Sequence, residues 1–295
     1  MRIQKDRLIG VALISPSILA VLIFVYGFII WSARVSFSDW VGLIPNYEWA
    51  GFKNYLGLFK DPRFHIDIRN TIIFTVLFVG GCLLLGLVLA ILLDQDLPGE
   101  GFFRNVYLFP MAISYIVTGV SWRWLMNPAM GSRMSGFNLL FDKLGLDFLI
   151  SNWYTTPYWG IAFIAIPAIW QMSGYVMALY LSGLRSIPGE LREAARVDGA
   201  TEIEIYRHII LPLVRPITLS ALIILGHISL KVFDLIIAVA GKQVALDVPS
   251  VYMWFTTFDG YFFGRGAAIG TLLLMSVALL VIPYLRYSLK TEEEL

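Results

Sequence analysis

The chain has 295 residues, of which 58% are hydrophobic and 15% are charged, whereas an ordinary soluble domain carries about 25% charged residues. Together with a mean hydropathy of +0.74, this composition predicts a polytopic membrane protein and excludes a single soluble globular core. The net charge of +1 and the lack of a long Lys/Arg run argue against a nucleic-acid partner.

Six apolar stretches are long enough to cross a membrane, because a helix rises about 1.5 Å per residue and the hydrocarbon core is about 30 Å thick. We expect spanning helices over residues 8–32, 70–94, 105–126, 157–182, 217–240 and 266–287. The first stretch lacks an Ala-x-Ala-type cleavage site and exceeds the usual length of a signal-peptide core, so we interpret it as an uncleaved span. The predicted fold class is therefore all-α, a single transmembrane domain over residues 1–295 with six transmembrane helices.

The loop after the first expected span is rich in aromatic residues. Its large rings suit an amphipathic segment that lies among the lipid headgroups and anchors the chain there. These rings belong to Trp40, Trp49, Tyr55, Phe59 and Phe64.

Span 2 contains Gly86-x-x-x-Ala90, a small-residue pattern that permits close contact with another helix, including one of a partner subunit.

Polar residues within spans 4 and 5 are candidates for a solute path. In span 4, Gln171 and Tyr175 share a helix face and offer an amide and an aromatic ring, which suits a sugar. In span 5, His227, Lys231 and Asp234 are spaced i, i+4, i+7, which places them on one stripe of a continuous helix. Ionisable groups at membrane depth are costly, so this stripe either lines a polar path or contains a structural Lys231–Asp234 ion pair.

The polar loop over residues 186–214 is predicted to form two short helices. The first runs over 189–198, with Pro188 in its first turn, and ends at Gly199, where a positive φ is expected. Thr201 and Glu204 have the spacing of a capping box that opens the second helix. Pro212 is expected to stop that helix before span 5.

Catalytic and cofactor motifs are missing from the sequence. The Gly-Lys pair at 241–242 lacks the remaining residues of a phosphate-binding loop, so we expect no ATP site in this chain. The single cysteine, Cys82, allows no intrachain disulfide, and the three histidines are too widely spaced for a local metal cluster. We therefore expect no catalytic residue, metal or cofactor here.

The same loop carries a pattern with seven fixed positions, and at every one of them it resembles the signature of the permease subunits of binding-protein-dependent ABC importers. These positions are Glu193, Ala194, Ala195, Gly199, Ile209, Leu211 and Pro212. The resemblance implies that the loop is a cytoplasmic coupling element. It would dock into a cleft of an ABC ATPase dimer that binds ATP and Mg²⁺, and Glu193 would pair there with a basic residue. It also implies a multi-pass protein of a prokaryotic cytoplasmic (inner) membrane, in contact with lipid and with both termini cytoplasmic.

Three further segments resemble the carbohydrate-type permeases of this family. They comprise Gly51–Tyr55 with Asp61–Phe64, then Trp122–Trp124 with Asn127 and Pro128, and finally Phe233 and Asp234 with Gly264 and Gly270. Around Trp170, span 4 is similar to the maltose permease subunit, which implies that Gln171 and Tyr175 are among the sugar contacts. The sequence departs from the family where Gly241-Lys242-Gln243 replaces a Gly-Gly-Pro turn.

The resemblance predicts a permease that translocates a sugar or sugar-like solute. It would act with a second permease subunit, forming a heterodimer, and with an extracytoplasmic solute-binding protein that delivers the small-molecule sugar. Two alternatives stay open: an importer of glycerol-phosphate or another polar solute, and a secondary transporter driven by an ion gradient.

Overall fold

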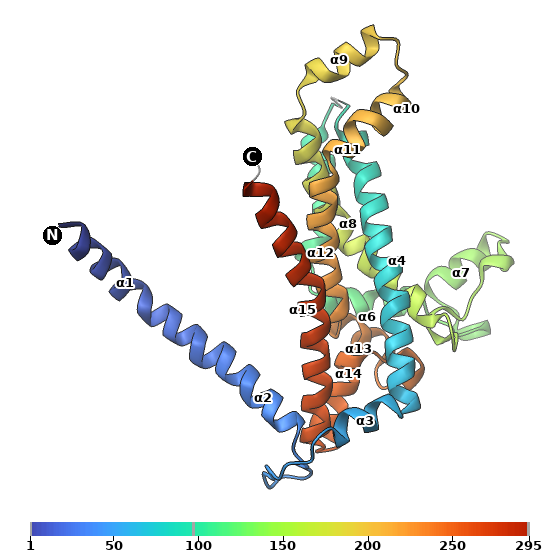
Figure 1. Ribbon diagram of the computed structural model, residues 1–295. Coiled ribbons are helices and arrows are strands. Elements are labelled where there is room, and N and C mark those ends of the chain that lie inside the picture. The colour runs from blue at the N-terminus through green and yellow to red at the C-terminus, as the bar shows by residue number, and fades with distance from the viewer. Residues whose placement is uncertain (1, 96–97, 294–295) are drawn as a thin grey trace. The chain divides into compact units, whose positions relative to one another are not determined.

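The computed structural model describes residues 2–95 and 98–293, with side chains described for residues 11, 13–95 and 98–286 (Figure 1). Helices account for all its regular elements, and one isolated bridge between Ser38 and Trp49 is the sole β-type pairing in the described residues. The predicted all-α class is therefore confirmed. The chain divides into two compact units, Met1–Asp61 with Tyr252–Met275 and Pro62–Val251 with Ser276–Leu295.

Unit 1 begins with a long apolar helical run. Helix α1 (Arg2–Val21) passes through one π-helical turn (Leu22–Gly27) into α2 (Phe28–Ser36). No residue of the most apolar part of Leu13–Ser36 is buried within the chain. This exposure suits a helix whose side chains face lipid or another subunit.

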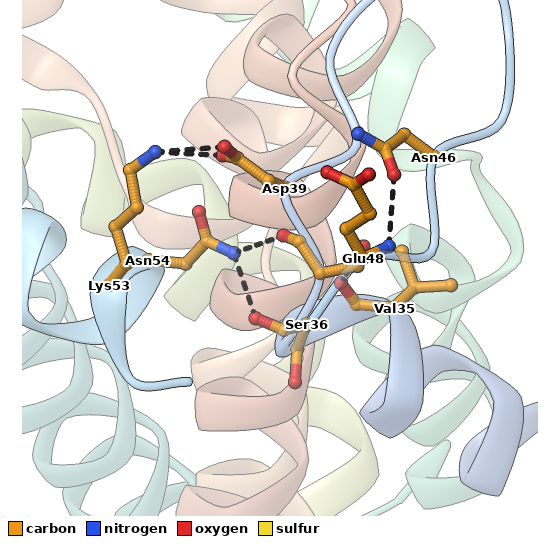
Figure 2. Close-up of polar contacts among 8 residues, drawn as sticks. Val35, Ser36, Asp39, Asn46, Glu48, Lys53 and Asn54 are labelled. Atoms are coloured by element: carbon orange, nitrogen blue, oxygen red, sulfur yellow. Dashed lines mark hydrogen bonds and ion pairs between the residues drawn. The ribbon is translucent and has the colours of Figure 1, made fainter. Parts of the chain in front are cut away.

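A compact loop follows α2 and contains the short helix α3 (Lys53–Phe59). Figure 2 shows how it is held: Asn54 Nδ2 donates to the main-chain oxygens of Ser36 and Ser38, each at 2.9 Å, and Lys53 pairs with Asp39 at 2.9 Å. The last carbonyls of a helix need hydrogen-bond partners from outside the helix, and Asn54 supplies one at the end of α2.

The expected headgroup anchor in this region is partly wrong. Trp40 and Phe64 are buried, and Tyr55 is half-buried with its hydroxyl 2.6 Å from that of Ser36. Only Trp49 and Phe59 of the five rings are exposed. Because Trp40 and Phe64 are buried, their rings are unavailable to lipid.

Unit 2 is built around the contact between α4 (Pro62–Leu93) and α8 (Gly160–Ser186). Gly86 makes their close approach possible, because a Cβ at this position would stand 2.6 Å from Val176. Gly86 and the fully buried Ala90 therefore face a helix of the same chain. Unit 2 also includes α5 (Glu100–Leu108), α6 (Tyr115–Leu125), α7 (Gly136–Lys143), α12 (Arg215–Leu230) and α13 (Asp234–Ala240), together with the short helices of the polar loop between α8 and α12.

The last two helices each contain residues of both units. Helix α14 (Pro249–Trp254) continues into a π-helical turn (Phe255–Asp259), and α15 (Phe263–Glu293) completes the chain.

Within the described residues, four single helices are long and apolar enough to cross a membrane: Leu13–Ser36, Pro62–Leu93, Gly160–Ser186 and Phe263–Arg286. A fifth candidate is a pair of helices, Glu202–Leu213 and Arg215–Leu230, with a bend of 61° between them. These agree with four of the six expected spans and with part of a fifth, so six crossings remain a prediction.

The expected spans 105–126 and 217–240 are wrong as continuous helices. The first is interrupted by a 3₁₀ turn (Phe109–Ala112), and Ser114 caps α6 by accepting a hydrogen bond from the Val117 amide at 3.3 Å. The second breaks at residues 231–233, where the Ser250 hydroxyl donates to the Val232 carbonyl. A carbonyl that leaves the helical ladder needs such a partner, because an unpaired buried group is costly.

Candidate functional site

The polar loop after α8 folds into two short helices at one end of unit 2 (Figure 1). Helix α9 (Gly189–Val197) follows Pro188, and α10 (Glu202–Ile205) follows Thr201. Gly199 has a φ of +85°, and Thr201 and Glu204 form both hydrogen bonds of a capping box. The predicted helices, the glycine conformation and the capping box are therefore confirmed.

The predicted stop at Pro212 is displaced by one residue, because the helical run ends at Leu213 and the chain bends by 61° before α12. After α10 the chain continues through a π-helical turn (Tyr206–Ile210) into α11 (Leu211–Leu213), which contains Pro212, and bends only at Val214. Pro212 therefore lies in the last turn of the helical run Glu202–Leu213, and a proline inside a helical path is commonly found where that path ends or bends.

One face of this loop is open. Glu193 and Ala194 are exposed, Ala195 is half-buried, and the apolar side chains of Val197 and Ile203 are 87% and 79% exposed. Near α11, Ile209 is half-buried and Leu211 is exposed. Exposed apolar side chains beside an acid, on a loop held by its own caps, favour a protein-docking surface.

The opposite face of α9 is tied to the body of unit 2. Arg192 Nη2 donates to Asp94 Oδ2 at 3.0 Å, and Asp94 directly follows the end of α4. Sequence reasoning missed this pair, although an acid directly after a long apolar span could have drawn attention to it.

A cavity of about 200 Å³ lies in unit 2 beside the break between the end of α12 and the start of α13. Lys231 and Asp234 both line it and are exposed, while His227 lies on α12, half-buried and outside the lining. The cavity is lined by Phe74, Phe78, Tyr115, Ala168, Ile228, Lys231, Val232, Phe233, Asp234 and Leu235.

The expected single stripe of His227, Lys231 and Asp234 is wrong, because Lys231 ends α12 and Asp234 begins α13. Throughout the described part of the chain, no ion pair joins Lys231 to Asp234, so the structural-pair alternative is not realised here. The helix break turns both charges toward the cavity.

The two span 4 candidates lie elsewhere. Gln171 is buried and donates from Nε2 to the Ile113 carbonyl at 2.5 Å, which holds the extended segment before α6. Tyr175 is half-buried. Neither residue lines the cavity, so the structure groups them with each other on α8 rather than with Lys231 and Asp234.

Tyr115 is a cavity residue that sequence reasoning missed. Its hydroxyl is buried without a hydrogen-bond partner among the described residues, and its ring lines the cavity. A buried hydroxyl normally has a partner, and a solute would reach this one only after a local rearrangement that exposes it. Across the described side chains, no group of three or more His, Cys, Asp or Glu residues is placed to hold a metal ion.

Comparison with known proteins gives consistent matches. Residues 82–290 match the family described as "Binding-protein-dependent transport system inner membrane component". A "Probable ABC transporter permease protein" of Pyrococcus horikoshii is 43% identical over 295 residues, which cover 99% of this chain and 100% of the relative. The xylose/arabinose import permease of Haloferax volcanii is 34% identical, with 90% of this chain and 83% of the relative covered. The trehalose/maltose transport system permease of Thermococcus litoralis is 30% identical, with 96% and 94% covered.

A solved structure shares the fold. A chain of a bacterial ABC transporter involved in the import of the acidic polysaccharide alginate superimposes with a TM-score of 0.80 at 24% identity. The match covers 97% of this chain and 99% of that chain. The same kind of transporter has been solved in complex with an alginate pentasaccharide-bound periplasmic protein.

Proposed function

The chain belongs to the family of binding-protein-dependent transport system inner membrane components, and from that premise we propose that it carries a sugar or sugar-like solute across the cytoplasmic membrane using ATP hydrolysed by a separate ATPase. As a member of this family it is a multi-pass permease subunit of an ABC importer. Relatives of sugar-type specificity that cover most of its length support the solute class.

The observation that carries this proposal is the open face of the loop between α8 and α12. Glu193, Val197 and Ile203 stand exposed on a framework fixed by Gly199 and the capping box. Burial of one large aliphatic side chain contributes about 1.5–3 kcal/mol, so an ATPase cleft that covers Val197 and Ile203 gains affinity from them. A partly desolvated partner of Glu193 would fix the orientation.

The cavity supports a polar solute path. Lys231 and Asp234 give it a cation and an anion within otherwise apolar walls. Binding sites for small molecules combine an apolar lining with a few placed polar groups. Gln171 and Tyr175 on α8 remain proposed solute contacts outside this cavity, and so does His227 on α12.

The proposed complex contains a second permease subunit, an ATPase dimer that binds ATP and Mg²⁺, and an extracytoplasmic solute-binding protein. The periplasmic protein in the related alginate transporter supports the last of these. Both termini are proposed to be cytoplasmic, on the same side as α9 and α10.

The glycerol-phosphate alternative is less well supported. An anionic solute favours a cavity rich in Lys and Arg, and here the one lysine of the cavity faces the same space as Asp234.

The test is a charge reversal on the open face. Glu193→Lys is expected to abolish copurification of the ATPase and solute uptake by the assembled complex, because it places a cation against the basic partner. Glu190→Lys is the matched control, since Glu190 is exposed on the same helix. Unchanged uptake in Glu193→Lys would refute the docking role.

A further inference from the structure

An ion pair joins the coupling helix α9 to the end of α4. Arg192 Nη2 lies 3.0 Å from Asp94 Oδ2, and the two side chains are only 22% and 9% exposed. The open face of α9 carries the exposed Glu193 and Val197, whereas Arg192 is half-buried and pairs with Asp94. The pair therefore belongs to the inner side of the loop and leaves the docking face free.

Arg185, in the last turn of α8, extends the connection to two more helices. Its Nη2 contacts Glu100 Oε2 at 2.7 Å at the start of α5 and the Leu93 carbonyl at 3.5 Å, and its Nε lies 3.9 Å from Asp94 Oδ1. A cation at the C-terminal end of α4 also interacts favourably with the helix dipole. Asp94 is thus the one carboxylate in this group that faces both arginines.

The burial of these groups decides how firmly they are joined. An exposed ion pair exchanges readily with water and contributes little, but a carboxylate withdrawn from water depends on its partners, so separating it from them is costly. A displacement of α9 must then either break a shielded pair or move the end of α4 with it.

We propose that Asp94 is a positioning residue for energy coupling, which transmits the displacement of α9 through Arg192 into α4, the helix whose Phe74 and Phe78 line the cavity. This inference rests on the proposed function, because α9 is displaced only if an ATPase binds it.

The test uses the assembled complex in proteoliposomes, with ATP hydrolysis, solute uptake and retention of the ATPase measured side by side. Arg192→Gln and Asp94→Asn are each expected to retain the ATPase and its hydrolysis within about 2-fold. Both should raise the ATP consumed per solute by about 10-fold, within the range of typical coupling between sites. Arg192→Lys, which keeps the cation, should restore most of the coupling.

The double variant separates a shared path from two independent defects. Two residues that act through one contact are not additive, so the double variant should lose no more coupling than either single variant. The control is Glu202→Gln, which removes the short but exposed Arg196–Glu202 pair at 2.8 Å on the same loop and should leave the ATP-per-solute ratio unchanged.

A wild-type ATP-per-solute ratio in Arg192→Gln, or additive losses in the double variant, would overturn the inference. A wild-type chain that retains no ATPase would instead refute the proposed function itself.

Discussion

Gly174 in α8 lies directly against Tyr107 in α5: a Cβ added to Gly174 would stand 1.9 Å from the Tyr107 carbonyl oxygen. That atom is main chain and cannot rotate away, so any side chain at Gly174 must separate the two helices. The contact fixes α5 beside α8, at the residue before Tyr175 in α8 and just before the 3₁₀ turn that follows α5.

Gly174→Ala is therefore expected to destabilise the protein by about 1–3 kcal/mol, the usual cost of overpacking. The measurement is thermal unfolding of the purified protein in detergent. Gly80→Ala is the matched control, because Gly80 is also helical and nothing lies within 4 Å of its added Cβ. Alanine raises helix propensity by up to about 1 kcal/mol, so the control should be neutral or stabilising. Equal unfolding temperatures for both variants would contradict the close contact.

Gly199→Pro is expected to abolish uptake without reducing the amount of protein in the membrane. Proline cannot adopt the φ of +85° found here, and it removes the amide that donates to the Arg196 carbonyl at 3.1 Å. The angle between α9 and α10 would then be lost. Uptake by the assembled complex and immunoblotting of membranes measure the two effects. Gly189→Ala, at a site with open space around it, is the control. Wild-type uptake in Gly199→Pro would show that the geometry of the loop is irrelevant.

Tyr115→Phe should leave thermal stability unchanged and lower the uptake of a hydroxyl-rich solute several-fold. Its hydroxyl forms no hydrogen bond within the described structure, so its removal costs the fold nothing. A bound solute would lose one hydrogen bond, worth about 0.5–1.5 kcal/mol. Tyr180→Phe should lower thermal stability and leave uptake unchanged. The Tyr180 hydroxyl donates to Thr218 Oγ1 at 2.9 Å, and Tyr180 is not among the residues that line the cavity. A Tyr115→Phe variant with full uptake would remove the Tyr115 hydroxyl from the solute path.

The Arg185–Glu100 contact should depend on pH in a defined direction. The hydrogen bond from Arg185 lowers the pKa of the Glu100 carboxyl below its ordinary value. A lowered carboxyl pKa means that the stabilisation is complete above the pKa of the unfolded state and disappears as the pH falls through the lower pKa of the folded state. Thermal unfolding of the wild type and Glu100→Gln should therefore differ at neutral pH and converge in acid. Curves that converge only at alkaline pH would contradict this assignment.

The loop between α8 and α12 could be predicted from sequence because its signals are local. Gly199 and the Thr201–Glu204 capping box determine their own backbone within a few residues. The break at residues 231–233 could not be predicted, since its free carbonyl is satisfied by Ser250, which is distant in sequence. The break before α6 depends in the same way on Gln171. Hydropathy alone counts such broken segments as continuous spans.

The burial of the Trp40 and Phe64 rings also could not be predicted from the sequence. Aromatic composition is compatible with both a lipid anchor and a packed core, and only the tertiary contacts distinguish the two.

Solute uptake into sealed proteoliposomes, with and without the ATPase, tests the central claim most directly. The complete complex should accumulate solute only when the ATPase has access to ATP, and this chain with its partner permease but no ATPase should accumulate none. Accumulation that an ion gradient drives in vesicles containing this chain alone would contradict the account.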